Sequence, residues 1–302
     1  MGEVNGPPVS PQVPPLDLGG SGNPAYRLRQ VRHGWFLYNL KDFYIGGSLD
    51  RYGEYCEDEL RLLLKLVNPD GLIIEAGANI GAHTIPLARH VGPKGAVFAF
   101  EPQRIIFQLL CANVALNTLA NVATINCGLG AATGKAIVPP VDYRRLNNFG
   151  GVSLIHDFDG ESVEIHPIDA LNLSRCDLIK IDVEGMELAV LQGAARTITQ
   201  FRPHLYVENN IAERSPALIS YLQSLGYRMW WHLTTLMRPD NFFGNPSNMF
   251  GQAASCNMIC IHARRAGAVT GGREISGPDE PLPIRPPGSS SGEDDASVTN
   301  GG

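Results

Sequence analysis

Short apolar runs alternate with helical periodicity through the middle of the chain. Residues 72–74 and 96–100 are apolar runs of the kind that form strands buried on both faces of a parallel sheet. Between them, apolar residues recur at helical spacing until Gly92 and Pro93 interrupt the pattern. Strand, glycine turn, helix and strand in this order predict a βαβ unit over residues 71–102.

The alternation continues beyond this unit and predicts an α/β fold, with a mostly parallel sheet and helices on both faces. The same patterns predict helices over residues 57–67, 104–116, 186–199 and 216–225, and strands over residues 122–126, 178–181, 205–207, 227–232 and 258–262. Between residues 133 and 167 the helical pattern breaks, and short strands at 135–138 and 162–165 predict a small β insertion. We expect this insertion to be a candidate region for acceptor recognition.

The two ends of the chain differ from its middle in composition. Residues 1–24 and 266–302 are rich in Pro, Gly and Ser, and they carry few large apolar side chains. Such segments bury too little apolar surface to offset the entropy lost on ordering, so we expect disordered tails there. The domain that carries the chemistry is expected at residues 71–265.

Residues 25–70 are expected to form a lid or cap ahead of that domain. Alternating apolar and polar positions over residues 26–50 predict two short strands that end at Gly46-Gly47, and the helix of residues 57–67 follows. The polar residues Arg51, Tyr52 and Glu54 stand between the two parts. Two interpretations of them stay open, a lid over a ligand and an ordinary turn with a solvated ion pair.

Composition narrows the function classes. The 302 residues, 44% of them hydrophobic, suffice for one substantial domain. The net charge is −6 and no Lys/Arg run stands out, so nucleic acid is not an expected partner. No apolar run reaches the ~18 residues that span a bilayer, and the N-terminus lacks the order of a secretory signal, so no membrane partner is expected. The six cysteines form no Cys-x-x-Cys pair, which favours reduced thiols in a cytoplasmic protein over a zinc site.

The glycine turn after the first strand of the βαβ unit predicts a cofactor site. Gly77 and Gly81 allow a sharp bend that a ligand can approach closely, and Glu75 and Asn79 flank it with polar groups. Glu101 ends the neighbouring strand, where a carboxylate can accept hydrogen bonds from both hydroxyls of a ribose. The pattern therefore indicates an adenosine-containing cofactor. The alternative is a turn whose glycines serve packing alone.

The spacing of the turn favours S-adenosyl-L-methionine over a dinucleotide. A dinucleotide site requires G-x-G-x-x-G so that bare backbone meets the pyrophosphate, and here Asn79 occupies the middle position. S-adenosylmethionine carries no phosphate, and its zwitterionic amino-acid end suits polar side chains. Cys127 and Gly128 follow the third strand, where an adenine ring is expected to lie. A nicotinamide-dependent oxidoreductase acting on a nucleotide sugar remains the alternative from another class.

Acidic residues at the ends of two further strands predict the catalytic side of the same site. Asp182 and Glu184 follow the strand at 178–181, and Glu208 follows the strand at 205–207. Methyl transfer to a hydroxyl needs a group that takes or weakens its proton, so Asp182 is the expected base, with Glu184 and Glu208 assisting. The alternative role for Asp182 and Glu184 is capping of the helix that follows. Several close carboxylates can also hold Mg²⁺, but no metal-type Asp/Asn ladder is present and a metal is not favoured. A catalytic base at His83 is a weaker alternative.

These stretches resemble the FkbM family of S-adenosylmethionine-dependent methyltransferases. The resemblance covers about residues 44–208 and rests on four segments, IIEAGANIGAHT, VFAFEP, IDALNLSRCDLIKIDVEGMELAVLQGA and LYVEN. It implies a Rossmann-like sheet of seven strands in the order 3-2-1-4-5-7-6. It also implies methylation of a hydroxyl, often on a sugar or another small natural product.

The resemblance assigns roles to individual residues. By match to the family, cofactor binding falls to Glu75, Gly77, Asn79, Gly81 and Glu101. The acidic motif of the family corresponds to Asp182, Glu184 and Glu187. The turn after the third strand lacks the acid that is common there. Two further alternatives stay open, transfer to nitrogen of a peptide amide side chain and a non-catalytic binding module, and neither the acceptor nor the oligomeric state follows from the sequence.

Overall fold

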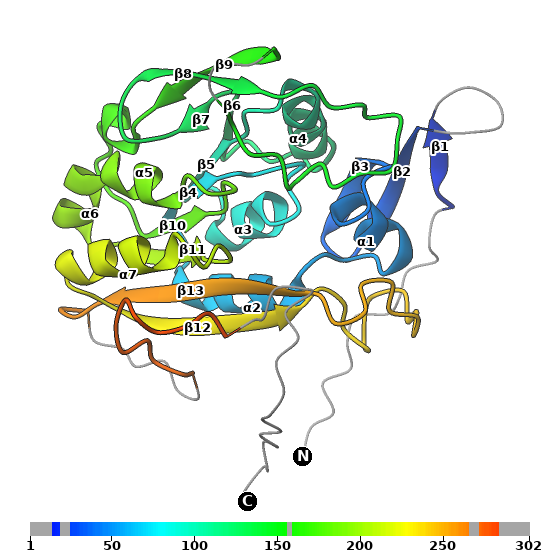
Figure 1. Ribbon diagram of the computed structural model, residues 1–302. Coiled ribbons are helices and arrows are strands. Elements are labelled where there is room, and N and C mark those ends of the chain that lie inside the picture. The colour runs from blue at the N-terminus through cyan, green and yellow to red at the C-terminus, as the bar shows by residue number, and fades with distance from the viewer. Residues whose placement is uncertain (1–13, 19–24, 156–158, 266–271, 284–302) are drawn as a thin grey trace, which may run out of the picture.

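A seven-stranded sheet forms the centre of the computed structural model, which describes residues 14–18, 25–155, 159–265 and 272–283 (Figure 1). From edge to edge its strands are β12 (Tyr227–Thr235), β13 (Ala254–His262), β11 (His204–Glu208), β10 (Leu178–Ile181), β4 (Leu72–Ala76), β5 (Ala96–Phe100) and β6 (Val122–Ile125). Numbered along the chain, this is the expected order 3-2-1-4-5-7-6, read from β6. β6, β5, β4, β10 and β11 are parallel, and β13 is antiparallel to both of its neighbours.

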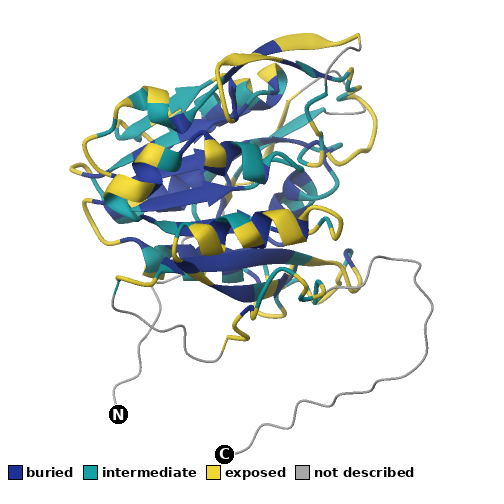
Figure 2. Cartoon of the chain, turned by 60° about the vertical axis from the view of Figure 1, so that its left-hand side comes forward, coloured by how far each residue is buried: buried dark blue, intermediate teal, exposed yellow. Residues whose placement is uncertain are grey.

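Helices cover both faces of this sheet because alternate residues of its strands point to opposite sides. Ile73 packs in one buried cluster with side chains of α2 (Glu57–Leu66), α3 (Thr84–Val91) and α4 (Arg104–Leu116). Its neighbour Ile74 packs in another with side chains of α5 (Glu187–Gln192), α6 (Ala195–Phe201) and α7 (Ser215–Ser224). Figure 2 shows the resulting layers, with buried strands between helices whose outer faces are exposed. Because α2 is part of a sheet face, it is not a separate cap.

The hairpin expected near the N-terminus lies beside this core, but its second half differs from the prediction. β2 (Tyr26–Val31) and β3 (Gly34–Asn39) form the hairpin, whereas residues 45–51 form α1 (Ile45–Arg51) and not a strand. The Asp42 carboxylate accepts hydrogen bonds from the backbone N–H groups of Tyr44 and Gly46, which favours the helical turn. A Cβ at Gly46 would collide with the carbonyl oxygen of Asn39, so glycine permits the close approach of helix and strand.

Parts of both expected tails are ordered. Residues 16–18 form β1 (Leu16–Leu18), which pairs with β2 in a three-stranded antiparallel sheet at one side of the molecule (Figure 1). Near the other end, Ile275 is buried and its N–H donates to the carbonyl oxygen of Met229 on β12. Local composition predicted disorder there because it does not register docking onto a distant strand.

Two further elements complete the fold. The inserted β segment is a small sheet of β7 (Gly128–Leu129), β9 (Glu161–His166) and β8 (Gly134–Val138). The helix predicted at residues 186–199 is two helices, α5 and α6, separated at Gly193, where a Cβ would collide with the carbonyl oxygen of Gly130. No helix in the described part of the chain is both long and apolar enough to cross a membrane.

Candidate active site

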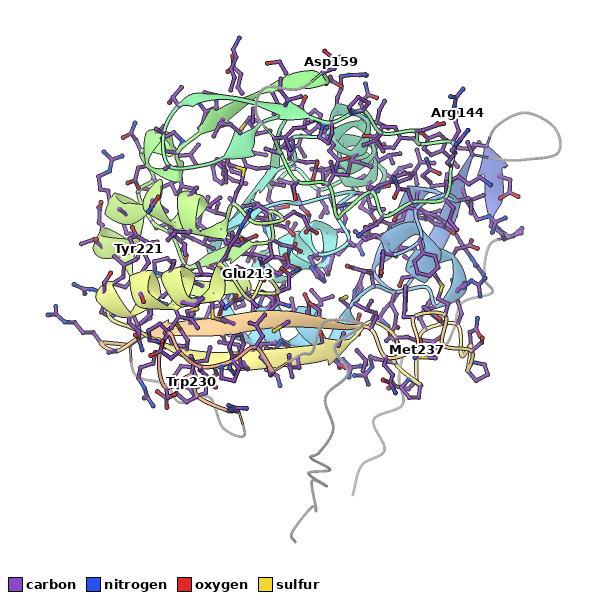
Figure 3. All side chains as sticks on the ribbon, viewed as in Figure 1. Arg144, Asp159, Glu213, Tyr221, Trp230 and Met237 are labelled. Carbon is purple, nitrogen blue, oxygen red and sulfur yellow. The ribbon has the colours of Figure 1, made fainter. Side chains whose placement is uncertain are left out.

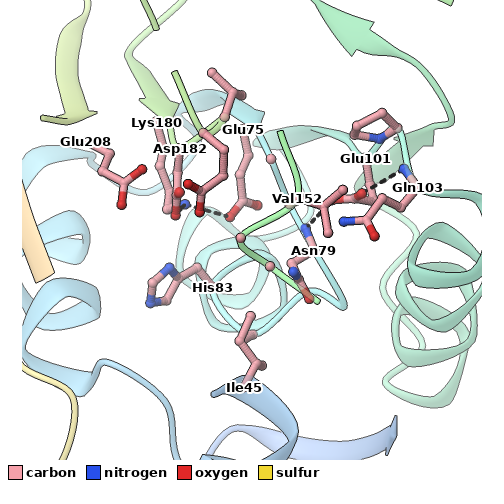
Figure 4. Close-up of a pocket in the computed structure, with 18 of the residues that line it drawn as sticks. Ile45, Glu75, Asn79, His83, Glu101, Gln103, Val152, Lys180, Asp182 and Glu208 are labelled. Atoms are coloured by element: carbon pink, nitrogen blue, oxygen red, sulfur yellow. Dashed lines mark hydrogen bonds and ion pairs between the residues drawn. The ribbon is translucent and has the colours of Figure 1, made fainter. Parts of the chain in front are cut away.

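A cavity of about 310 Å³ lies beyond the carboxyl ends of β4, β5, β10 and β11. Open parallel sheets bind ligands at this edge, because the loops that follow the strands diverge there. Polar side chains gather at two ends of the cavity in Figure 4: Asn79, Glu101 and Gln103 at one end, and His83, Lys180, Asp182 and Glu208 at the other. The two groups are called the nucleoside end and the acidic end below.

At the nucleoside end, the glycine turn and Glu101 are directly joined. The N–H of Asn79 donates to Oε2 of Glu101 at 3.0 Å, and the N–H of Gln103 donates to Oε1 at 2.9 Å. The turn itself depends on Gly77, whose φ is +79°, and a Cβ there would collide with the carbonyl oxygen of Asp182. The predicted partners thus meet, and the helix α3 begins at Thr84.

Burial controls the charge of Glu101. Only 3% of the residue is exposed, and this desolvation raises the pKa of its carboxyl to about 7. The hydrogen bonds from Gln103 and Asn79 act in the opposite direction, because they stabilise the carboxylate. Further donors reaching the same carboxylate, such as ribose hydroxyls, would favour the charged form as well.

At the acidic end, carboxylates from two neighbouring strands converge. Asp182, Glu184 and Glu208 each offer an oxygen atom, and these atoms lie within 4.8 Å of one another. Burial, then the charges of Asp182 and Glu187, raises the pKa of Glu184 to about 7. Burial also raises the pKa of Glu208 well above its ordinary value, and the charge of Asp182 adds to the effect. The structure therefore brings together the three residues that the sequence marked as catalytic.

A buried lysine, which sequence reasoning missed, stands among these acids. Lys180 is 2% exposed, and its Nζ lies 3.2 Å from Oδ2 of Asp182 and 4.0 Å from Oε1 of Glu75. Burial alone would lower the pKa of Lys180, but the charges of Asp182, Glu75 and Glu59 outweigh it, so the pKa is raised and the ammonium persists. The available signal was a lysine between Ile179 and Ile181 in an otherwise apolar strand.

The capping alternative for Asp182 and Glu184 is wrong. α5 begins at Glu187 after Met186, and in the described chain no side chain caps that helix start. The acid that binds backbone in this loop is Glu187, which accepts the N–H of Gly185 at 2.8 Å. Glu184 has φ of +52°, an uncommon conformation for a residue with a side chain, and it lines the cavity.

The remaining predicted cofactor residues divide into two groups. Glu75, Cys127 and Gly128 line the cavity, and Glu75 is fixed by the hydroxyl of Thr84, which donates to its Oε2 at 2.6 Å. Gly81 is not among the lining residues. Its φ is +88°, a backbone conformation that other residues rarely adopt, so this glycine serves the turn itself.

The walls of the cavity also include residues of the two segments that the sequence expected to form a cap and an inserted β region. Tyr55 and Glu59 come from the start of α2 and the residues before it, and Asn148 and Val152 come from the β insertion. The insertion is held over the nucleoside end by Gln103, whose amide donates to the carbonyl oxygen of Phe149 at 2.8 Å.

The group Arg51, Tyr52 and Glu54 does not line the cavity, so the lid interpretation fails for these residues. The solvated-turn interpretation fails as well, because Glu54 is buried and accepts a hydrogen bond from Arg32 at 2.7 Å. The neighbouring Tyr44, Ile45 and Tyr55 line the cavity instead.

The family model described as the methyltransferase FkbM domain matches residues 75–229, slightly more than half of the 302 residues. The chain belongs to the FkbM methyltransferase family. Both polar ends of the cavity fall largely within the matched residues, whereas Tyr44, Tyr55, Glu59 and Ser255 lie outside them. The family thus accounts for most of the polar site, and other parts of the chain supply the rest of its wall.

The matches between this FkbM family member and individual relatives cover only part of each chain. Methyltransferase 1 of Beauveria bassiana is 29% identical over an alignment of 146 positions, and the match covers 41% of this chain and 58% of that protein. The hexuronic acid methyltransferase AglP of Haloferax volcanii is 27% identical over 147 residues, 47% of this chain and 57% of that protein. The chain thus spans a little over half the length of these curated relatives. The crystal structure of a methyltransferase FkbM from Methylobacillus flagellatus KT aligns with a TM-score of 0.44 and 24% identity, over 64% of this chain and 44% of that chain.

Proposed function

We propose that the protein transfers a methyl group from S-adenosyl-L-methionine to a hydroxyl of a sugar or another small natural-product acceptor. The observation that carries the proposal is the hydrogen bond between Asn79 and Glu101, which joins the glycine turn to a buried carboxylate inside one cavity. A nucleoside with two free ribose hydroxyls matches that end, because each hydroxyl can donate to the Glu101 carboxylate.

The remaining parts of the cofactor have partners along the same cavity. Cys127 and Gly128 line it where an adenine is expected, with the carboxylate of Glu101 nearby on the adjoining strand end. Glu75 and Asn79 offer a carboxylate and an amide to the charged amino-acid end. The cofactor supplies an electrophilic methyl group on a sulfonium. The protein supplies orientation, and its walls exclude water from the reacting atoms.

The acidic end is the proposed acceptor side. The hydroxyl oxygen forms a bond to the methyl carbon while the carbon–sulfur bond breaks, its electron pair remaining on sulfur. The hydroxyl proton passes to the carboxylate group of Asp182, Glu184 and Glu208, which lie together at this end. Because Lys180 already donates a hydrogen bond to one oxygen of Asp182, the three acids are proposed to act together.

A sugar acceptor is supported by one relative, since AglP of Haloferax volcanii is named as a hexuronic acid methyltransferase. Several walls of the acidic end are polar, as a sugar requires. Glu59 receives hydrogen bonds from Thr234 at 3.2 Å and from Asn257 at 3.1 Å, and it reaches the cavity together with Ser255.

Calorimetric titration with S-adenosylhomocysteine tests the cofactor half of the proposal. We expect one site per chain, and Glu101→Gln should weaken binding on the order of 10–100-fold, because a hydrogen bond to a charged group contributes about 1.5–3 kcal/mol. Glu161→Gln is the matched control, since Glu161 is exposed and lies outside the cavity. Absence of binding at millimolar ligand, or tight binding of NADH instead, would contradict the proposal. Transfer of radiolabelled methyl to a panel of sugars and uronic acids tests the other half.

A further inference from the structure

We infer that the acidic end binds a divalent cation through Asp182, Glu184 and Glu208, and that this cation holds the acceptor through two neighbouring oxygen atoms. The statement about the cation stands on the geometry of the cavity. The statement about the acceptor rests on the proposed methyl transfer and makes it more specific, because it names the kind of hydroxyl that would be methylated.

The spacing of the carboxylates fits a cation. Their nearest oxygen atoms lie within 4.8 Å of one another, from the loops that follow the adjacent strands β10 and β11. Hard divalent cations bind oxygen at about 2.0–2.6 Å, so ligands on opposite sides of one ion lie about 4–5 Å apart. Small rotations of these side chains, which need no movement of the strands, suffice to close such a site.

Two buried atoms at this end point to a missing partner. Oε2 of Glu208 is inaccessible and has no hydrogen-bond partner in the described structure, while Oε1 accepts the amide of Asn210 at 2.8 Å. His83 is 5% exposed, and within the described residues its Nε2 likewise has no partner. Figure 4 places His83 at the same end of the cavity as Glu208 and Asp182. Leaving such atoms unsatisfied is unfavourable, and a cation with its bound water answers both, as a ligand for Glu208 and as a donor for His83.

The charges around the three acids favour a cation as well. Lys180 contacts Oδ2 of Asp182 while also lying 4.0 Å from Glu75. One ammonium therefore faces more than one carboxylate, and the second oxygen of Asp182 remains a possible ligand. A divalent ion would offset negative charge that this one ammonium leaves uncompensated. Because the ligands are all carboxylate oxygens, Mg²⁺ or Mn²⁺ suits them better than Zn²⁺.

Three protein ligands leave coordination positions for the acceptor. A cation with six positions can take two oxygen atoms of one molecule, which selects a vicinal diol or a hydroxyl beside a carboxylate, as in sugars and uronic acids. A hydroxyl that binds the cation has a lowered pKa, so it reacts with the methyl group more readily. The carboxylates then hold the ion, and the ion weakens the O–H bond in place of a single side-chain base.

Titration of the metal-free full-length protein with Mn²⁺, followed by electron paramagnetic resonance, tests the site without cofactor or acceptor. We expect one bound Mn²⁺ per chain, and at least tenfold weaker binding for Asp182→Asn and for Glu208→Gln. Asp159→Asn is the matched control, because Asp159 is exposed and lies at the far side of the β insertion (Figure 3). Glu184→Gln gives a third arm, should either of the other two variants fold poorly.

The outcomes separate this inference from the proposed function. Absence of Mn²⁺ binding at millimolar concentration, or binding equally strong in the Asp182 and Glu208 variants, would overturn the cation site. If S-adenosylhomocysteine still binds and methyl transfer proceeds in EDTA, the proposed function survives without it. If the cation binds but diols and hydroxy acids are methylated no better than isolated hydroxyls, the acceptor statement fails alone.

Discussion

Lys180 and Asp182, two residues apart at the end of β10, form a 3.2 Å ion pair at the acidic end of the cavity. Lys180 lies within β10 and therefore within the sheet, while Asp182 lies in the loop that follows this strand. The lysine also stands 4.0 Å from Glu75 on the neighbouring β4, so one buried ammonium links the acidic end to the wall of the cofactor site.

Replacing this lysine should destabilise the protein. Lys180→Met leaves Glu75, which is 1% exposed, without its cationic neighbour, and removal of one partner from a buried pair costs about 3–5 kcal/mol. Urea unfolding measures the free energy, with Lys135→Met at an exposed site as the control, where the change should be within about 0.5 kcal/mol. Equal stability of the two variants would show that Lys180 does not compensate the buried carboxylate.

Cofactor affinity should rise with pH around neutrality. Burial raises the pKa of Glu101 to about 7, whereas ribose hydroxyls donate best to its ionised form. Calorimetry with S-adenosylhomocysteine from pH 6 to 8 should therefore show tighter binding at the higher pH, accompanied by proton release at the lower pH. In Glu101→Gln this pH dependence should be smaller, since the titrating group is gone. A wild-type affinity independent of pH would contradict ribose binding by Glu101.

The carboxyl group of Glu101 should also make the free energy of unfolding depend on pH, and this contribution should fall as the pH rises. The pKa of Glu101 is about 7 in the folded protein, against an ordinary 4.5, so the folded state binds more protons between those values. The contribution of Glu101 to the free energy of unfolding is fully present below about pH 4.5 and is lost as pH rises through 7. Comparing the wild type with Glu101→Gln by urea unfolding at pH 5, 6, 7 and 8 isolates this contribution. A difference that grows in favour of the wild type with rising pH would contradict the raised pKa.

Two glycines with positive φ should respond differently to alanine. Gly77 and Gly92 have φ of +79° and +70°, and Gly92 has ψ of −174°, so alanine at either position carries backbone strain of about 1–3 kcal/mol. At Gly77 the added Cβ also meets the carbonyl oxygen of Asp182, whereas at Gly92 nothing lies within 4 Å. Gly77→Ala should therefore lose more stability than Gly92→Ala in urea unfolding, and S-adenosylhomocysteine affinity should fall for Gly77→Ala only. Equal losses in both variants would argue against a tight turn at Gly77.

The ordered segment after residue 271 should contribute to stability. Ile275 is 4% exposed and packs in the buried cluster that includes Met229, so Ile275→Ala should cost about 2–5 kcal/mol. Leu16→Ala is the control, since Leu16 is 55% exposed and its truncation should have little effect. The melting temperature of both variants measures the difference. An unchanged melting temperature for Ile275→Ala would support the tail that composition suggested.

Where local pattern was informative, the prediction of the fold was accurate. Strands at 96–100 and 178–181 and the helix at 104–116 agree with β5, β10 and α4, because buried strands and amphipathic helices leave a periodicity that neighbours in sequence reveal. The strand predicted around Phe43 and Ile45 was wrong, because contacts of Asp42 with Gly46 and of Gly46 with Asn39 decide the helix there. Such contacts override local preference, and their partners cannot be read from the apolar pattern.

The sequence by itself determined the alternation of strands and helices, the family motifs and the acids that follow the strands, since these depend on residue type and spacing along one chain, whereas the order of the strands in the sheet followed only from the family resemblance. Only the tertiary structure decided that Glu101 binds the Asn79 turn and that Gly81 lies outside the cavity wall, and only it placed Lys180 beside Asp182 and Glu75. Charge and burial are the physical reason. The pKa of a carboxyl group and the need of a lysine for counter-ions depend on atoms a few ångströms away, and those atoms come from other strands.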